Sequence, residues 1–186
     1  MKYHTITYPD RTSGHGLRVV LRLSGCSHRC FNCQNPQTWD VNSGIPFDES
    51  AKKELFRELD KDYISGLTLS GGDPLHEANL DGVLDLVNEI RLSFPNKTIW
   101  IYSGYIFSEL FMYDEKIKRC PNYLRKDVME IYQKRQQIIS KCNVMVDGKY
   151  IDSQRDISLR WRGSKNQDVI NIQQSLQNGE IVLWTE

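Results

Sequence analysis

Short apolar runs alternate along this chain with longer segments in which apolar residues recur every three or four positions. Apolar and polar residues alternate over residues 17–23, which predicts a strand with one apolar face. Continuous apolar runs bounded by glycine, proline or polar turn residues predict further, buried strands. These are expected at residues 66–70, 98–102, 143–146 and, after Gly179, 181–184.

The segments between these strands have the spacing of amphipathic helices. Asp48 is a suitable N-cap for a helix that runs to about Leu59. A second helix is predicted over about residues 77–92, because its apolar residues fall on one face. Residues 107–140 are expected to be mostly helical, with an interruption at Pro121.

Strands that alternate with amphipathic helices predict βαβ units, and therefore an α/β fold with a mainly parallel sheet. Four glycine-rich or polar segments directly follow predicted strands. They are the loop that starts at Cys26 and residues 70–73, 103–104 and 147–148. In parallel α/β folds, ligands bind beyond the carboxyl ends of the strands. We therefore expect all four segments to share one edge of the sheet and to form the functional site.

Length and charge narrow the class of protein. The 186 residues suit a single domain over residues 1–186, and 24 basic against 24 acidic residues give a net charge of zero. This balance offers no basic field for nucleic acid. The N-terminus lacks the apolar segment of a signal peptide, and no apolar run is long enough to cross a membrane. We therefore expect a cytoplasmic protein with no membrane partner and with reduced thiols.

The cysteines supply the strongest chemical signal. Cys26, Cys30 and Cys33 follow a C-x3-C-x2-C pattern, which in a reducing compartment indicates a metal or redox site. A [4Fe–4S] cluster normally takes four cysteines, so three would leave one iron open to a substrate. The same thiolates also suit zinc, with His28 as a fourth ligand. The spacing favours the cluster but leaves the zinc interpretation open.

The segment Ser70-Gly71-Gly72-Asp73-Pro74 is less specific taken alone. Its glycines would let the backbone approach a ligand closely, and Asp73 could accept hydrogen bonds from an ammonium group. The alternative is an ordinary strand-to-helix turn in which Asp73 or a neighbour caps the next helix.

Together, the cysteine pattern and the Gly-Gly-Asp segment resemble the radical S-adenosylmethionine (SAM) superfamily. Further motifs resemble, in the same order, the family that activates anaerobic (class III) ribonucleoside-triphosphate reductase, over roughly residues 3–167. These motifs are residues 13–18 (SGHGLR), 34–39 (QNPQTW), 70–75 (SGGDPL), 99–105 (IWIYSGY), 146–150 (VDGKY) and 161–167 (WRGSKNQ).

The resemblance implies a radical SAM enzyme with an incomplete α/β barrel. A [4Fe–4S] cluster on the three cysteines would cleave SAM reductively and generate a glycyl radical on the reductase. A flavodoxin-like protein would supply the electron. The open side of the barrel would admit a large protein substrate.

The resemblance also assigns SAM contacts. The methionine amino group would lie against Gly71, Gly72 and Asp73. Backbone around Asn32, Cys33 and Gln34 would lie near the adenine, and Ser103 is a candidate for the ribose side. No side chain is required as a general base.

The sequence departs from the family pattern at several points. Asn32 stands where an aromatic residue is common, His15 where proline is usual, and Asp73 where most radical SAM enzymes have glutamate. A helical insertion is expected at about residues 112–137, as a solvated charged face or as a docking surface for the reductase. The four histidines, His4, His15, His28 and His76, are expected at surface or capping positions.

Two rival functions remain. One is another radical SAM activase, such as the pyruvate formate-lyase type. The other is a zinc-stabilised binding module without catalysis, which would leave the later motifs unexplained.

Overall fold

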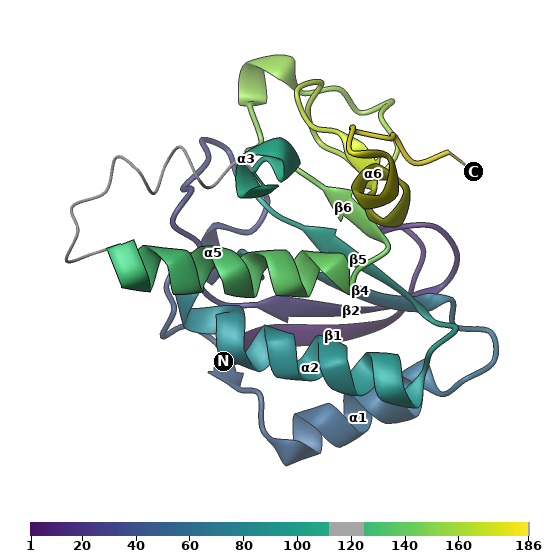
Figure 1. Cartoon of the computed structure of the whole chain (residues 1–186). Helices are drawn as coiled ribbons and strands as arrows, with labels where there is room; N and C mark the ends of the chain where they lie inside the picture. The colour runs from purple at the N-terminus through teal and green to yellow at the C-terminus, as the bar shows by residue number, and fades with distance from the viewer. Residues whose placement is uncertain (112–124, 186) are drawn as a thin grey trace.

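The computed structural model describes residues 1–111 and 125–185. Seven strands form one sheet in the order β3-β1-β2-β4-β5-β6-β7 (Figure 1). Their bounds are β1 Lys2–Asp10, β2 Arg18–Leu23, β3 Ile45–Pro46, β4 Gly66–Gly71, β5 Thr98–Tyr102, β6 Val144–Val146 and β7 Val169–Asn171.

The centre of this sheet is parallel and its margins are antiparallel. β2, β4, β5 and β6 pair in parallel with one another. β1 runs antiparallel to both β2 and β3, and β7 runs antiparallel to β6. The predicted mixed α/β architecture is confirmed. The parallel centre places the carboxyl ends of four strands side by side.

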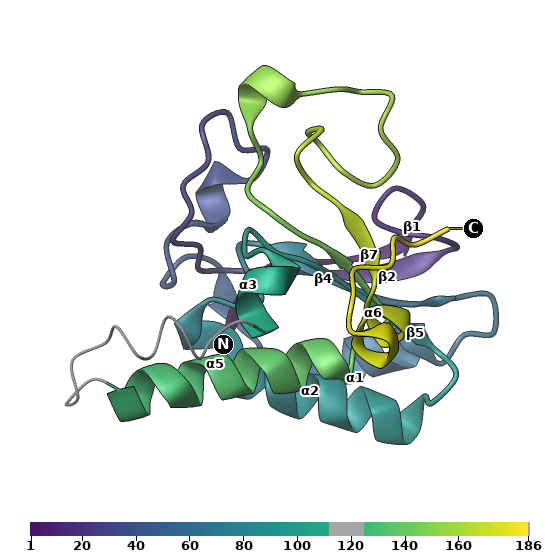
Figure 2. The ribbon, with the colours of Figure 1, turned by 45° about the horizontal axis from the view of Figure 1, so that its top comes forward.

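Helices cover one face of the sheet (Figure 2). The helices are α1 Glu49–Leu59, α2 Leu80–Ser93, α3 Phe107–Phe111, α5 Arg125–Ser140 and α6 Ile172–Asn178. Asp48 caps α1 as predicted, because its carboxylate accepts the amides of Ser50 and Ala51 at 3.0 Å each. The main core lies between these helices and the sheet. It includes the fully buried Val19, Leu21, Leu23, Leu55, Leu59, Leu67, Leu69, Val83, Val87 and Ile90.

The opposite face carries a smaller aromatic cluster. Trp100 of β5 is buried, and its ring centroid lies 5.2 Å from those of both Trp161 and Trp184. Trp161 belongs to the segment between β6 and β7, which rises from this face of the sheet in Figure 2. Tryptophans therefore join this segment to the sheet.

Arg18, at the start of β2, is fully buried on this same face. Its guanidinium donates to Thr68 Oγ1 at 2.6 Å, to His15 O, Thr98 Oγ1 and Thr98 O at 3.0 Å each, and to Leu67 O at 2.5 Å. It also lies 5.4 Å from the Trp100 ring centroid. All five N–H groups of an arginine are thereby used. Desolvation lowers the pKa of Arg18 to about 9.

Several boundaries differ from the sequence predictions. The helix expected at about residue 77 begins as a 3-10 turn, Glu77–Asn79, and α2 starts at Leu80. The strand predicted at 181–184 is wrong: it makes one isolated bridge, Ile170 to Leu183. β1, β3 and β7 were not predicted. β1 is only partly buried, both residues of β3 are exposed and β7 has three residues, so these strands lack a clear apolar run.

Residues 112–124 of the expected insertion lie outside the described residues, as does Cys120. The rest, residues 125–137, forms most of α5, which packs on α2. Lys134 fits a solvated charged face, since its Nζ lies 2.8 Å from both Asp81 and Glu130 carboxylates. Arg135 does not fit that expectation, because it is only 4% exposed. The Tyr105 ring lies 4.1 Å from its guanidinium and stabilises it below the surface.

Cys142 is fully buried, as expected of a core cysteine. Over the described ranges, no helix combines the length and apolar character needed to cross a lipid bilayer.

Candidate metal centre

The strand ends meet at one edge of the sheet, as the sequence predicted. The Gly72 amide donates to Leu23 O, and the Asp73 amide donates to Gly25 O, each at 2.7 Å. Both bonds tie the Gly-Gly-Asp segment to the start of the cysteine loop. From the next strands, the Ser103 hydroxyl donates to Asp73 Oδ1 at 2.9 Å, and the Gly148 amide donates to Tyr105 O at 3.0 Å.

The two glycines of this segment are required by close backbone packing. A Cβ on Gly72 would lie 2.5 Å from Gly25 O, and a Cβ on Gly71 would lie 2.7 Å from the Leu23 amide nitrogen. Gly71 also has a φ of +97°. The glycine pair therefore lets β4 and the cysteine loop approach each other.

The cysteine loop turns sharply in two places. Arg29 and Asn32 both have positive φ, 46° and 53°. The Cys26 amide donates to Trp39 O at 3.0 Å, and the Cys33 amide donates to Cys30 O at 3.2 Å. These turns place three thiols within one short loop.

Backbone amides lie near all three sulfurs. The Asn35 amide donates to Cys33 Sγ at 3.4 Å. The backbone of His28 and Arg29 acts to lower the pKa of Cys26, and the backbone of Tyr150 acts to lower that of Cys30. Burial nevertheless raises the pKa of the Cys26 and Cys30 thiols. Soft thiolates that accept backbone N–H groups are the donors that iron–sulfur clusters use, so this donor set fits such a cluster.

The side chains around the cysteine loop bear on the choice between a cluster and a single zinc ion. Among residues 1–111 and 125–185, no group of three or more His, Cys, Asp or Glu side chains surrounds one point as the ligands of one ion would. In a cluster each thiolate binds a different iron, so the sulfurs need not converge. His28, the candidate fourth zinc ligand, instead places Nε2 2.7 Å from Asp73 Oδ2.

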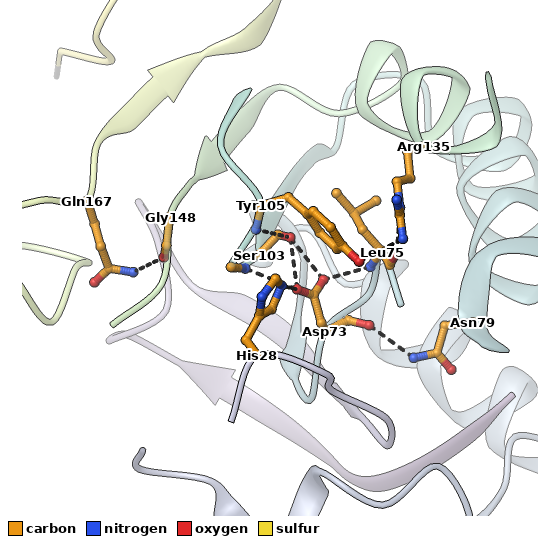
Figure 3. Close-up of polar contacts among 10 residues, drawn as sticks. His28, Asp73, Leu75, Asn79, Ser103, Tyr105, Arg135, Gly148 and Gln167 are labelled. Atoms are coloured by element: carbon orange, nitrogen blue, oxygen red, sulfur yellow. Dashed lines mark hydrogen bonds and ion pairs between the residues drawn. The ribbon is translucent and has the colours of Figure 1, made fainter. Parts of the chain in front are cut away.

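Asp73 is the polar centre of this edge (Figure 3). It is 1% exposed, and its carboxylate accepts the Leu75 amide at 2.8 Å, the Gly104 amide at 3.0 Å and the Ser103 hydroxyl. The contact from His28 completes the set. The contact with the Leu75 amide is the one expected of an ordinary strand-to-helix turn. The other three contacts join Asp73 to separate segments of the chain. Both carboxylate oxygens are therefore engaged by the protein itself.

The other predicted residues lie apart from this centre. Asn32 and Gln34 are exposed. Cys33 and Gln34 line a cavity of about 430 Å³. Asp73 and Ser103 do not line it. The cavity wall also includes residues that the sequence reasoning did not assign to a site: Arg22, Tyr102, Tyr150, Trp161, Arg162 and Gln167. Trp161, Arg162 and Gln167 belong to the WRGSKNQ motif, and that motif is the sequence feature that could have identified them.

The histidines differ in environment. His76 caps the turn before α2 by accepting the Ala78 amide at 3.2 Å, as expected for a capping position. His28 contradicts the expectation, because its side chain is only 9% exposed. Its ring packs 4.7 Å from that of Tyr105, between the cysteine loop and the sheet edge.

The raised thiol pKa values predict slow alkylation of the metal-free protein. The thiolate is the reactive form, so iodoacetamide should modify Cys26 and Cys30 more slowly than a cysteine in an unfolded peptide at about pH 7.5. Below the pKa, each pH unit upward should raise these rates about tenfold. Peptide mass spectrometry gives the rate at each position.

Cys142 is the internal control for this measurement. Burial raises the pKa of its thiol to about 12, so it should stay unmodified throughout. Rates at Cys26 and Cys30 equal to those of the unfolded peptide would contradict the prediction.

Comparison with known proteins places this site in a family. A family profile described as 4Fe-4S single cluster domain matches residues 12–170. The anaerobic ribonucleoside-triphosphate reductase-activating protein of Escherichia coli K12 is 38% identical over 171 residues, covering 91% of this chain and 97% of the relative. The protein of that name from Vibrio cholerae is 37% identical, covering 90% and 96%. The one from Enterobacteria phage T4 is 35% identical, covering 90% and 92%. This chain therefore belongs to the family of anaerobic ribonucleoside-triphosphate reductase-activating proteins and contains a 4Fe–4S single cluster domain.

Proposed function

We propose that this chain is a radical SAM enzyme that generates a glycyl radical on an anaerobic ribonucleoside-triphosphate reductase. The observation that carries the proposal is the three-thiol loop, which is hydrogen-bonded to the Gly-Gly-Asp strand end in a chain of this family. The relatives are named for activating that reductase. The open sheet would serve as an incomplete barrel, with room at its edge for a protein substrate.

Cys26, Cys30 and Cys33 would hold the [4Fe–4S] cluster, and the fourth iron would be free for SAM. When bound, the cluster supplies the electron for reductive cleavage of SAM, which leads to removal of a hydrogen atom from a glycine of the reductase. The chain's own contribution is to present three thiolates and to orient them with backbone amides. The half-buried loop would also limit access of water and oxygen.

The Gly71-Gly72-Asp73 segment would hold the methionine amino group of SAM. Because both carboxylate oxygens of Asp73 already receive contacts from the protein, its side chain would act by fixing the conformation of this segment. Backbone around Asn32, Cys33 and Gln34 would lie near the adenine. Ser103 would contribute to the ribose side through its link to Asp73.

A flavodoxin-like protein would donate the electron, and the cytoplasm would supply the reducing conditions that the free thiols require. The whole chain would act as one domain. Its helical insertion at about residues 112–137 would be a feature of this member of the family.

The test begins with the anaerobically reconstituted, dithionite-reduced protein. We expect an EPR signal of a reduced [4Fe–4S] cluster that changes when SAM is added, together with release of 5′-deoxyadenosine. Addition of the reductase from the same source should then give the EPR signal of a protein glycyl radical. A radical on a pyruvate formate-lyase-type enzyme instead would favour the rival activase. A colourless, zinc-containing protein without these signals would contradict the proposal.

A further inference from the structure

The middle of the cysteine loop is held by side chains. Within the part of the chain that the structure describes, residues 27–32 make no backbone–backbone hydrogen bond to another segment. The flank before them does, since the Gly25 amide donates to Thr38 O at 2.7 Å and the Cys26 amide to Trp39 O. The arc between the first two cysteines therefore needs a side-chain anchor to keep a defined position.

His28 provides such an anchor. Its Nε2 lies 2.7 Å from Asp73 Oδ2, and its ring packs edge-on against Tyr105 with centroids 4.7 Å apart. In Figure 3 the imidazole points from the loop toward the carboxylate. Among the described residues this pair is close without having hydrogen-bond geometry, so the imidazole is held by its proximity to the carboxylate and by its packing on the Tyr105 ring.

The slot that receives the imidazole is shaped by Gly104. A Cβ at this position would lie 2.3 Å from His28 Cδ2. Gly104 is not among the glycines with positive φ, so its backbone conformation is open to alanine. The space taken by the histidine ring, rather than backbone conformation, therefore requires glycine here.

The other walls of the slot are fixed independently of the loop. The Tyr105 hydroxyl accepts from Arg135 of α5 at 2.7 Å, and the Arg135 guanidinium stacks on its ring. Asp73 is held by Ser103 and by the amides of Leu75 and Gly104. The receiving surface is thus preorganised by β4, β5 and α5.

We propose that His28 is the positioning residue of the cysteine loop. It inserts into the slot formed by Asp73, Gly104 and Tyr105 and thereby sets the place of Cys26 and Cys30 relative to the Gly-Gly-Asp strand end. The effects of His28 on an iron–sulfur cluster rest on the proposed function, whereas the insertion of His28 into the slot does not.

Hydrogen–deuterium exchange of the metal-free protein tests the docking directly. In His28→Ala, the hydrogen-bonded amides at the two ends of the loop, Gly25, Cys26 and Cys33, should exchange at least about tenfold faster than in the wild type, while the central strands keep their protection. His4→Ala is the matched control, because His4 contacts Ser43 at 2.9 Å away from the slot. Unchanged exchange of the loop in His28→Ala would overturn the proposal.

A double-mutant cycle with Gly104 tests the slot. Gly104→Ala alone should expel the imidazole and speed loop exchange about as much as His28→Ala. The double variant should be no worse than His28→Ala, because the clash has gone. Additive effects of the two changes would contradict the proposal. If His28→Ala fails to fold, Gly104→Ala alone decides the matter, since unchanged loop exchange in that variant would also contradict the slot.

The reconstituted protein gives a second, separate measurement. His28→Ala should lose iron from its cluster about 10- to 100-fold more readily and change the EPR spectrum of the reduced cluster, and His28→Gln should restore part of the loss. Tighter SAM binding by His28→Ala would mean that the histidine competes for Asp73, and would overturn the positioning role. If the wild type cleaves no SAM, the proposed function fails, while the exchange results still decide the docking.

Discussion

Serine in place of Cys26, Cys30 or Cys33 should lower glycyl-radical formation on the reductase by at least about 1000-fold. The three cysteines act as one ligand set, so the loss of any one of them should remove nearly all activity. Each variant should also bind less iron and lose the visible absorption of the cluster. The three single variants and the triple variant should be similarly inactive, because the cluster needs every ligand. Iron content, absorption and the glycyl-radical EPR signal are the measurements.

Cys142→Ser is the control for these variants. Cys142 is a buried core residue whose thiol donates to Ile138 O at 3.3 Å, so this change should leave iron content unaltered. Any one of the three loop variants with wild-type iron and activity would remove that cysteine from the proposed ligand set. It would then favour a different iron-binding arrangement.

Arg18→Met should lower the free energy of unfolding by roughly 3–5 kcal/mol, the largest stability effect expected for a single substitution in the sheet. The change removes a fully buried guanidinium that joins β2 to β4 and β5. The carbonyl groups of Leu67 and Thr98 then lose this donor. A methionine side chain can fill the space but has no N–H group to donate to them. Urea unfolding followed by circular dichroism measures the effect.

Arg11→Met is the matched control, since Arg11 is exposed and its loss should change the free energy of unfolding by no more than about 0.5 kcal/mol. Arg18→Lys should fall between the two, because it keeps the charge with fewer donors. A change below about 1 kcal/mol in Arg18→Met would mean that desolvation of the guanidinium cancels the gain from its hydrogen bonds.

The placement of the site could be predicted because it depends on local patterns. An alternating pattern located β2, and continuous apolar runs located β4, β5 and β6. Glycine or cysteine within a few residues of each strand end then identified the carboxyl end. In a parallel sheet these ends must share one edge. The contacts of Asp73 with Gly25 and Ser103 confirm that convergence.

The margins of the sheet could not be predicted in the same way. β1 is only partly buried and β3 is exposed, and the two pair antiparallel at one edge, where a regular apolar pattern is not needed. Residues 181–184 looked like a strand because they are apolar, yet Leu183 makes a single bridge to Ile170. Whether a short apolar run joins a sheet depends on which neighbours have free backbone groups, which the run itself does not specify.

By itself, the sequence determined the α/β class, the cysteine pattern and the strand-end location of the site, because each follows from short-range spacing. Only the tertiary structure decided the partners of the charged and polar side chains. His28, expected at the surface, is buried against Asp73, and Arg135, expected on a charged face, stacks on Tyr105. Such contacts join residues 30 to 45 positions apart, and their geometry is set by the packing of the sheet and α5, which local sequence does not encode.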